Sequence, residues 1–229
     1  MHTISKTGKT VSYILKLTVI LCAAAGTVIS ARAGRNSFMG GSRVFMFFTI
    51  QSNIDVAAVC AAEAFLLARG KPIPGAWYVV KLAGTVSITL TGVVFAVLLV
   101  PILGKGAWNL QNTLTHAVVP AAAAADFFVV ASGVHIRRKN VLWVIVPPVL
   151  YVIYAGVGYV RGWEFIRGLN YPYFFLNWGS PAGAFGFTKG MPYMGCAWWL
   201  ALLLLFLIAV GRCYAALAER LGAGKGRRP

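Results

Sequence analysis

The chain has 229 residues, of which 59% are hydrophobic and 11% are charged, and its formal net charge is +16. Soluble domains carry about 25% charged residues, so this composition excludes an ordinary soluble globular domain and indicates an integral membrane protein. The basic excess does not predict nucleic-acid binding, because most basic residues lie between apolar segments, where anionic headgroups and the positive-inside rule favour them.

Six stretches of the chain are long and apolar enough to cross a bilayer as helices, for which about 20 apolar residues suffice. They cover residues 11–31, 44–68, 76–103, 114–134, 142–161 and 191–216. We therefore predict an all-α integral membrane protein with a single six-helix transmembrane domain over residues 1–216. The basic, Gly-rich tail over 217–229 is predicted to be disordered.

The first apolar stretch has two interpretations. Lys6 and Lys9, followed by apolar residues and by Ala31-Arg32-Ala33, are typical of a secretory signal peptide with a small-residue cleavage site. We favour an uncleaved first helix, since no soluble domain follows for export. With the N-terminus in the cytoplasm, the inner segments carry eleven basic residues and the outer segments seven. The positive-inside rule therefore predicts that both termini lie in the cytoplasm.

The second span is unusually polar for a membrane helix. Its polar side chains are Thr49, Gln51, Ser52, Asn53, Asp55 and Glu63. Residues four apart share a helix face, which pairs Thr49 with Asn53 and Gln51 with Asp55. Polar positions within the bilayer are costly unless they face a bundle interior or a cavity, so we expect this helix to line one.

His116 is the histidine that lies inside an apolar span, and Asn112 precedes it by one helical turn. The second and fourth spans both start at the outer face in the predicted topology. Thr49 and His116 lie within a few residues of these starts, so at 1.5 Å of rise per residue they lie at similar depths. The two side chains can therefore meet if their helices are neighbours.

A threonine hydroxyl near a histidine suggests nucleophilic catalysis, because the hydroxyl is a poor nucleophile until a base takes its proton. The side-chain amides of Asn53 and Asn112 are candidate donors to a developing oxyanion. Asp126 does not complete a triad, because ten residues place it about 15 Å along the helix axis from His116. The sequence therefore predicts a Thr–His dyad.

Four charged residues fall near one depth in the inner third of the predicted bundle: Lys16, Glu63, Lys81 and Asp126. One interpretation is that the lysines snorkel toward the interface and the acids compensate for them. The other is a direct pair between Lys81 and Asp126.

Two further segments shape the outer half of the predicted bundle. Pro147-Pro148 should kink the fifth span or break its backbone hydrogen-bond ladder. The connection over 162–190 is aromatic and includes Tyr171, which we predict to be a second-shell or cavity residue together with Gln51, Asp55 and Asp126. This connection is either the lid or rim of a cavity on the side of the dyad, or a simple interfacial aromatic belt.

Neither a metal site nor a disulfide framework is predicted. The three histidines do not cluster with acids or cysteines, and P-loop, Rossmann and GxSxG patterns are absent. The cysteines lie within or at the ends of apolar spans, without a CxxC pair, and are expected to be small buried apolar residues. They are Cys22, Cys60, Cys196 and Cys213. We expect no cofactor.

Three short motifs carry a family resemblance. They are Gly40-Gly41-Ser42 followed by Phe48-Thr49, then Asn112-x-x-x-His116-x-x-x-Pro120 with Asp126 ten residues after the histidine, and finally Tyr171-Pro172-Tyr173-Phe174. In these motifs the chain resembles the androgen-induced family of six-helix membrane proteins, which includes bacterial proteins predicted to have six spans. Animal members are hydrolases that cleave fatty-acid esters of hydroxy fatty acids within the membrane, with a threonine nucleophile and a histidine. The resemblance implies Thr49 as nucleophile and His116 as base.

The chain departs from the animal pattern just after the threonine, where Ile50-Gln51-Ser52-Asn53 replaces a second aromatic residue and an acid. The leading interpretation is a hydrolase of lipid-like esters in a bacterial plasma membrane. Its expected partners are membrane lipid and the lipid-like ester substrate, and the sequence does not predict its oligomeric state. One alternative is a proton- or ion-coupled transporter that uses Asp55, Asp126 and His116 as relay groups. The other is a non-catalytic lipid-binding or assembly protein.

Overall fold

The computed structural model describes residues 4–33 and 41–223. Within these ranges the chain is helical, and six segments are long and apolar enough to cross a membrane: Lys6–Ala33, Phe48–Ala68, Gly75–Leu103, Leu110–Val130, Arg138–Val160 and Cys196–Gly222. The predicted all-α architecture with six spanning segments is confirmed, although each segment differs by a few residues from its predicted bounds. Gly40, which the first motif includes, lies outside the described residues.

Three spans are single helices and three are composite. The single helices are α1 (Lys6–Ala33), α2 (Phe48–Ala68) and α9 (Cys196–Ala223). The third span joins α3 (Gly75–Val94), a π-helical turn η3 (Phe95–Leu99) and α4 (Val100–Leu103). The fourth joins α5 (Leu110–Thr113), a π-helical turn η4 (Leu114–Val118) and α6 (Val119–Val130). The fifth joins α7 (Arg138–Val141), a 3₁₀ turn η5 (Leu142–Ile145) and α8 (Val146–Val160).

Two predicted boundaries need correction. The second span was expected from residue 44, but residues Gly41–Met46 form the 3₁₀ helix η2 and α2 begins only at Phe48. The last helix was expected to end at 216 with a disordered tail, but α9 continues to Ala223. Residues 224–229 lie outside the described part of the chain.

Proline explains why the composite spans are interrupted. Pro101, Pro120 and Pro147 each occupy one of the first two positions of an α-helix that follows a π or 3₁₀ turn. Proline has no backbone N–H, and its ring displaces the carbonyl four residues earlier, so the regular i→i−4 ladder cannot pass through it. The predicted break at Pro147-Pro148 is confirmed, and the same effect at Pro120 reshapes the turn that contains His116.

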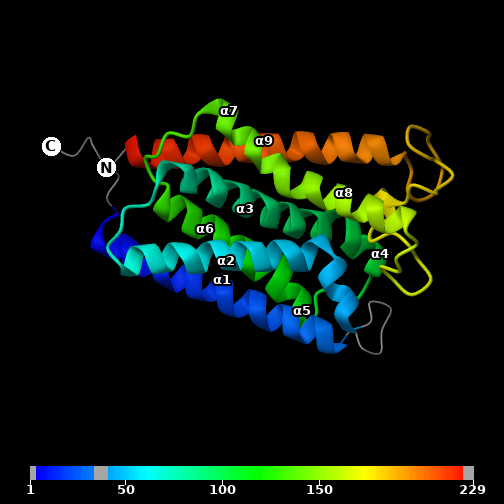
Figure 1. The fold of residues 1–229 in the computed structure, drawn as a ribbon, viewed down its shortest axis with the longest axis horizontal. Coiled ribbons are helices and arrows are strands. Elements are labelled where there is room, and N and C mark those ends of the chain that lie inside the picture. Colours follow the sequence, from blue (N-terminus) through cyan, green and yellow to red (C-terminus); the bar gives the residue numbers. More distant parts are fainter. Residues whose placement is uncertain (1–3, 34–40, 224–229) are drawn as a thin grey trace.

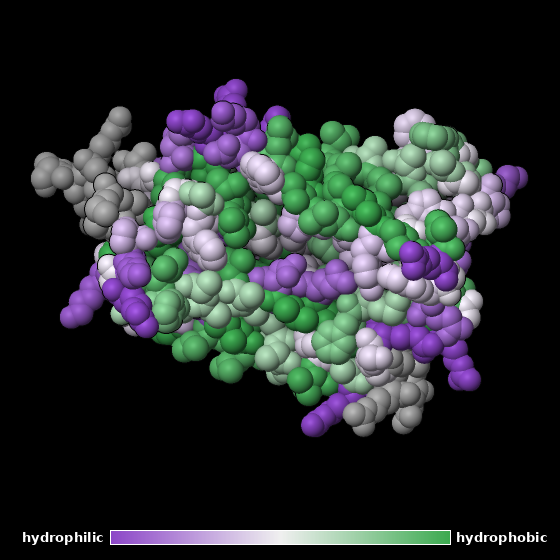
Figure 2. All heavy atoms as spheres, in the orientation of Figure 1, coloured by the Kyte–Doolittle hydropathy of each residue, from purple (hydrophilic) through white to green (hydrophobic). Residues whose placement is uncertain are grey.

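The helices pack as a bundle in which α3 is central, in contact with α2, α6, α8 and α9, while α1 packs against α2 and α6 (Figure 1). Helix α1 begins and α9 ends at one end of the bundle. At the opposite end lie α4, α5 and the long connection between α8 and α9 (Figure 1). On the face shown in Figure 2, hydrophobic atoms cover most of the middle apart from one hydrophilic patch, and further hydrophilic atoms gather toward the two ends, as expected for a membrane-spanning bundle.

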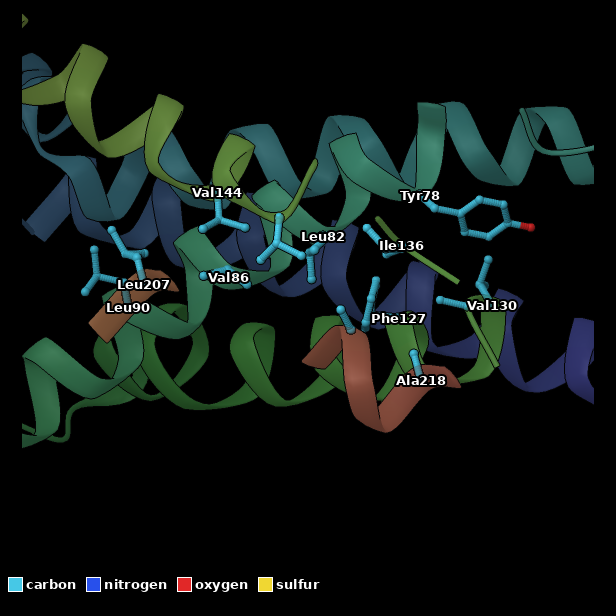
Figure 3. Close-up of a cluster of buried hydrophobic side chains, with 13 residues drawn as sticks. Tyr78, Leu82, Val86, Leu90, Phe127, Val130, Ile136, Val144, Leu207 and Ala218 are labelled. Atoms are coloured by element: carbon cyan, nitrogen blue, oxygen red, sulfur yellow. The ribbon is translucent and has the colours of Figure 1, made fainter. Parts of the chain in front are cut away.

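A cluster of buried apolar side chains joins α3, α6 and α9 (Figure 3). Its labelled members are Tyr78, Leu82, Val86, Leu90, Phe127, Val130, Ile136, Val144, Leu207 and Ala218. A second cluster, centred on Phe165 and Leu176, fixes the connection between α8 and α9 against the end of the bundle. That connection contains the short 3₁₀ helix η6 (Phe174–Leu176).

The four inner charged residues meet in one buried cluster, here called the ion cluster: Lys16, Glu63, Lys81 and Asp126. Lys16 Nζ lies 2.7 Å from Glu63 Oε2 and 2.8 Å from Asp126 Oδ1, and Lys81 pairs with both carboxylates. Each of the four side chains is at most 2% exposed, and Ser12 Oγ donates to Asp126 Oδ1. The snorkelling interpretation is therefore wrong, and the Lys81–Asp126 pair is formed within a larger neutral network.

Candidate active site

Thr49 and His116 meet near the end of the bundle opposite to that where α1 begins and α9 ends. Thr49 lies in the first turn of α2, and His116 lies in the π-helical turn η4. Thr49 Oγ1 is 3.4 Å from His116 Nε2, so the two side chains do come together as their predicted depths allow. His116 as a whole is only 8% exposed, and the contact is therefore largely shielded from solvent.

The other imidazole nitrogen determines which tautomer is present. His116 Nδ1 lies 3.1 Å from the backbone carbonyl oxygen of Asn112 and 2.9 Å from Thr115 Oγ1. A carbonyl oxygen can only accept, so Nδ1 carries the proton. The Thr115 hydroxyl donates to the Gln111 carbonyl, which leaves its oxygen free to accept from Nδ1 as well. Nε2 is therefore unprotonated and faces Thr49, which is the form that a general base requires.

The imidazole ring is held between two helical spans. Phe95, in the π-helical turn η3, stacks on it with a centroid distance of 3.9 Å and an interplanar angle of 25°. A Cβ on Gly92 would lie 2.7 Å from the His116 carbonyl oxygen, so only glycine permits this approach of α3 to η4. Two π-helical turns thus pack against each other at the dyad, and such turns are frequent at functional sites.

The two asparagines predicted to stabilise an oxyanion are engaged elsewhere. Asn53 Nδ2 donates to the backbone carbonyls of Thr49 at 2.7 Å and Thr115 at 3.2 Å, so it ties α2 to the turn that carries His116. Asn112 Nδ2 donates to the Ala107 carbonyl at 2.7 Å. Asn112 acts on His116 through its backbone carbonyl, and neither amide points at the dyad.

Tyr173, from the connection between α8 and α9, is a residue that the sequence reasoning did not select. The backbone N–H of Thr49 donates to the Tyr173 hydroxyl at 3.4 Å, and this hydroxyl also hydrogen-bonds the Thr49 side chain. Its ring stacks on Phe175 with an interplanar angle of 4° and meets Phe47 edge-on. Burial raises the pKa of the Tyr173 phenol above its ordinary value of 10.0, so the hydroxyl keeps its proton at physiological pH.

Two cavities meet at Thr49. One, of about 350 Å³, lies on the His116 side and is also lined by Tyr171 and Asn112. The other, of about 280 Å³, lies among α2, α3, α8 and α9, where leucine, valine and aromatic side chains form most of its wall. Thr49, Leu99 and Tyr173 line both cavities. The part of the connection from Tyr171 to Phe174 is thus a wall of the site, as the lid or rim interpretation requires.

The remaining predicted site residues lie apart from the dyad. Gln51 Nε2 donates to the Phe45 carbonyl at 3.0 Å, and Asp126 belongs to the ion cluster. Asp55 is exposed and lines a separate groove of about 710 Å³ between α2, α3, α7, η5 and α8. The expectation that all polar positions of the second span face the interior is therefore wrong for Asp55.

The side chains that could bind a metal ion do not cluster in the described part of the chain. In the ranges that the structure describes, no three histidine, cysteine or acidic side chains gather closely enough to bind a metal ion. No protein-family model, curated protein or solved structure matches the chain.

Proposed function

We propose that the protein is an intramembrane hydrolase of lipid-like esters, with Thr49 as nucleophile and His116 as general base. The observation that carries the proposal is the orientation of the imidazole. Its Nδ1–H is fixed by the Asn112 carbonyl, so the free lone pair of Nε2 faces the Thr49 hydroxyl. The separation of 3.4 Å is longer than a reactive hydrogen bond, but such bonds tighten when substrate binds.

The reaction would proceed in two halves. Thr49 Oγ1 forms a bond to the acyl carbon while His116 Nε2 takes the hydroxyl proton and the carbonyl electrons move onto oxygen. The tetrahedral intermediate then breaks the bond to the alcohol oxygen, which leaves with the proton from Nε2. In the second half, water deprotonated by Nε2 attacks the acyl-threonine, and the fatty acid and free Thr49 are released.

The shapes of the two cavities support a substrate with an acyl chain. The cavity lined by Leu200, Leu203 and Leu207 is apolar, and it reaches Thr49, so an acyl chain in it would bring its carbonyl carbon to the hydroxyl. The second cavity contains His116 and Asn112, and it suits the more polar alcohol portion and the attacking water. A substrate of this kind could enter laterally from the membrane.

We infer that the dyad lies toward the outer leaflet of a bacterial plasma membrane, with both chain ends in the cytoplasm. The basic run Arg137-Arg138-Lys139 forms the start of α7, which Figure 1 shows toward the end of the bundle where α1 begins. A basic bias at that end supports a cytoplasmic location by the positive-inside rule. The resemblance to bacterial six-span proteins supports the bacterial assignment.

Of the two alternatives, the lipid-binding one has an observation in its favour. The apolar cavity beside Thr49 would accept a lipid chain whether or not the dyad reacts. A proton or ion relay would need Asp55, Asp126 and His116 to line one continuous pathway through the bundle. Asp55 lies in its own groove and Asp126 is neutralised by lysines, so nothing described links the three.

Labelling with an alkyl fluorophosphonate tests the proposal directly, because this probe reacts with activated hydroxyl nucleophiles. We expect the purified, detergent-solubilised protein to be labelled on the peptide that contains Thr49. Thr49→Ala and His116→Ala should both abolish labelling. Thr18→Ala and His135→Ala are matched controls on exposed positions and should retain it. A folded wild-type protein that is not labelled, or labelling that survives Thr49→Ala, would contradict the proposed function.

A further inference from the structure

Attack of Thr49 on an ester places a negative charge on the carbonyl oxygen, and this charge needs hydrogen-bond donors that are already in place. The two asparagines beside the dyad do not supply them. Asn53 and Asn112 direct their amide hydrogens at backbone carbonyls. The oxyanion donors must therefore come from other groups around Thr49.

Two donors adjoin Thr49 on the side from which a substrate carbonyl can approach. One is the backbone N–H of Thr49, which lies in the first turn of α2, where N–H groups have no partner within the helix. The other is the Tyr173 hydroxyl, which this N–H contacts at 3.4 Å. Tyr173 lines both cavities, so its hydroxyl lies where an acyl chain and an alcohol portion would join.

We infer that Tyr173 is a catalytic residue, which donates a hydrogen bond to the oxyanion together with the backbone N–H of Thr49. This assignment rests on the proposed hydrolysis. The substrate oxygen would replace the long N–H contact to Tyr173 by two shorter, charge-assisted hydrogen bonds. The positive end of the α2 helix dipole would stabilise the same charge. Tyr173 transfers no proton; it donates while the carbon–oxygen bonds form and break.

The surroundings of Tyr173 hold this donor ready. The ring is fixed by stacking on Phe175 and by an edge contact with Phe47. Tyr151 packs beside it, with ring centroids 6.2 Å apart, and donates its own hydroxyl to the Met46 carbonyl. Burial keeps the Tyr173 phenol protonated by raising its pKa. A donor that is both fixed and protonated costs no reorganisation when the charge develops.

Tyr173→Phe keeps the ring and removes only the hydroxyl, so it tests the assignment with little change in packing. Hydrolysis of a medium-chain p-nitrophenyl ester should lose about 10²–10³-fold in kcat, as when an oxyanion donor is removed. Because the donor acts in the transition state, KM should change by less than about threefold. Tyr13→Phe on α1 and Tyr159→Phe on α8, at tyrosines that line neither cavity, are the matched controls and should keep most of the activity.

An inhibitor provides a readout that a merely structural tyrosine would not affect. An alkyl trifluoromethyl ketone adds the Thr49 hydroxyl to its carbonyl and forms an anionic hemiketal that mimics the intermediate. Its inhibition constant should rise in Tyr173→Phe by the same factor as kcat/KM falls. The corresponding alkyl alcohol, which forms no oxyanion, should bind both proteins equally.

If Tyr173→Phe fails to fold, a fluorinated tyrosine at position 173 replaces it as the test, since it keeps the ring and the hydroxyl. Fluorine lowers the phenol pKa, so the hydroxyl stops donating at a lower pH, and the alkaline loss of activity should move to lower pH. Two results would overturn the assignment if Thr49-dependent activity persists. One is a pH profile of activity that the fluorinated tyrosine does not shift. The other is a Tyr173→Phe protein with near-normal kcat and near-normal affinity for the ketone. Absence of any Thr49-dependent activity in the wild type overturns the proposed function and the assignment together.

Discussion

The ion cluster gives the sharpest test of how the bundle is held together. Lys81→Met leaves Lys16 to face the two carboxylates of Glu63 and Asp126, so one buried negative charge loses its partner. Removing one partner of a buried ion pair costs about 3–5 kcal/mol. Asp126→Asn leaves one ammonium uncompensated instead, and we expect a loss of stability in the same range.

The double variant Lys81→Met/Asp126→Asn restores neutrality, because Lys16 and Glu63 remain paired at 2.7 Å. It should therefore be destabilised by about as much as one single variant, so the coupling free energy between the two positions should equal one single effect, about 3–5 kcal/mol. Without the pairing, the two single effects would add.

Reversible unfolding by SDS in mixed micelles, followed by tryptophan fluorescence, measures these free energies. Lys71→Met, at an exposed position after α2, is the control and should change the unfolding free energy by less than about 0.5 kcal/mol. Additivity of Lys81→Met and Asp126→Asn to within about 0.5 kcal/mol would refute the reasoning.

Two further variants test the neighbourhood of the dyad. Gly92→Ala places a Cβ 2.7 Å from the His116 carbonyl oxygen, so it should displace η4, lower hydrolysis sharply and reduce the unfolding free energy by about 1–3 kcal/mol. Gly84→Ala, whose Cβ would meet only Val59 at 3.9 Å, is the control and should leave both unchanged. Asp55→Asn should leave ester hydrolysis at the wild-type rate, because Asp55 lines a separate groove. Abolished hydrolysis would contradict this separation from the dyad, and an ion flux that depends on Asp55 would favour the transporter interpretation.

The sequence predicted the six spans correctly, because the length of an apolar segment largely decides whether it can cross a bilayer. It predicted the ends of the helices less well. Helix α2 begins at Phe48 and α9 continues to Ala223, since terminal turns depend on packing and not on hydropathy. The two π-helical turns at Phe95 and Leu114 also escaped prediction, although Pro101 and Pro120 were available as a signal for them.

At the site, the position of each residue along its span was enough to predict that Thr49 and His116 can meet. The same reasoning could not predict which hydrogen bonds the neighbouring side chains make. An asparagine one turn from a reactive group looks like an oxyanion donor in sequence. Only the fold reveals that Asn53 reaches the Thr115 carbonyl and that Asn112 acts through its backbone. The sequence gives no reason to choose between Tyr171 and Tyr173, which are the same residue type two positions apart. Only the path of the connection in the fold shows that Tyr173 is the tyrosine that reaches Thr49.

The ion cluster also has a consequence for how the chain enters the membrane during synthesis. Its charges follow the chain in alternating sign: Lys16 on α1, Glu63 on α2, Lys81 on α3 and Asp126 on α6. Within the ion cluster, the first two spans therefore contribute one charge of each sign, and so do the next two. A single unpaired charge near the middle of a span costs about 2.5–3.5 kcal/mol on insertion. Insertion of the spans as two hairpins would avoid that cost at each stage, and the network would then form as the two hairpins pack together.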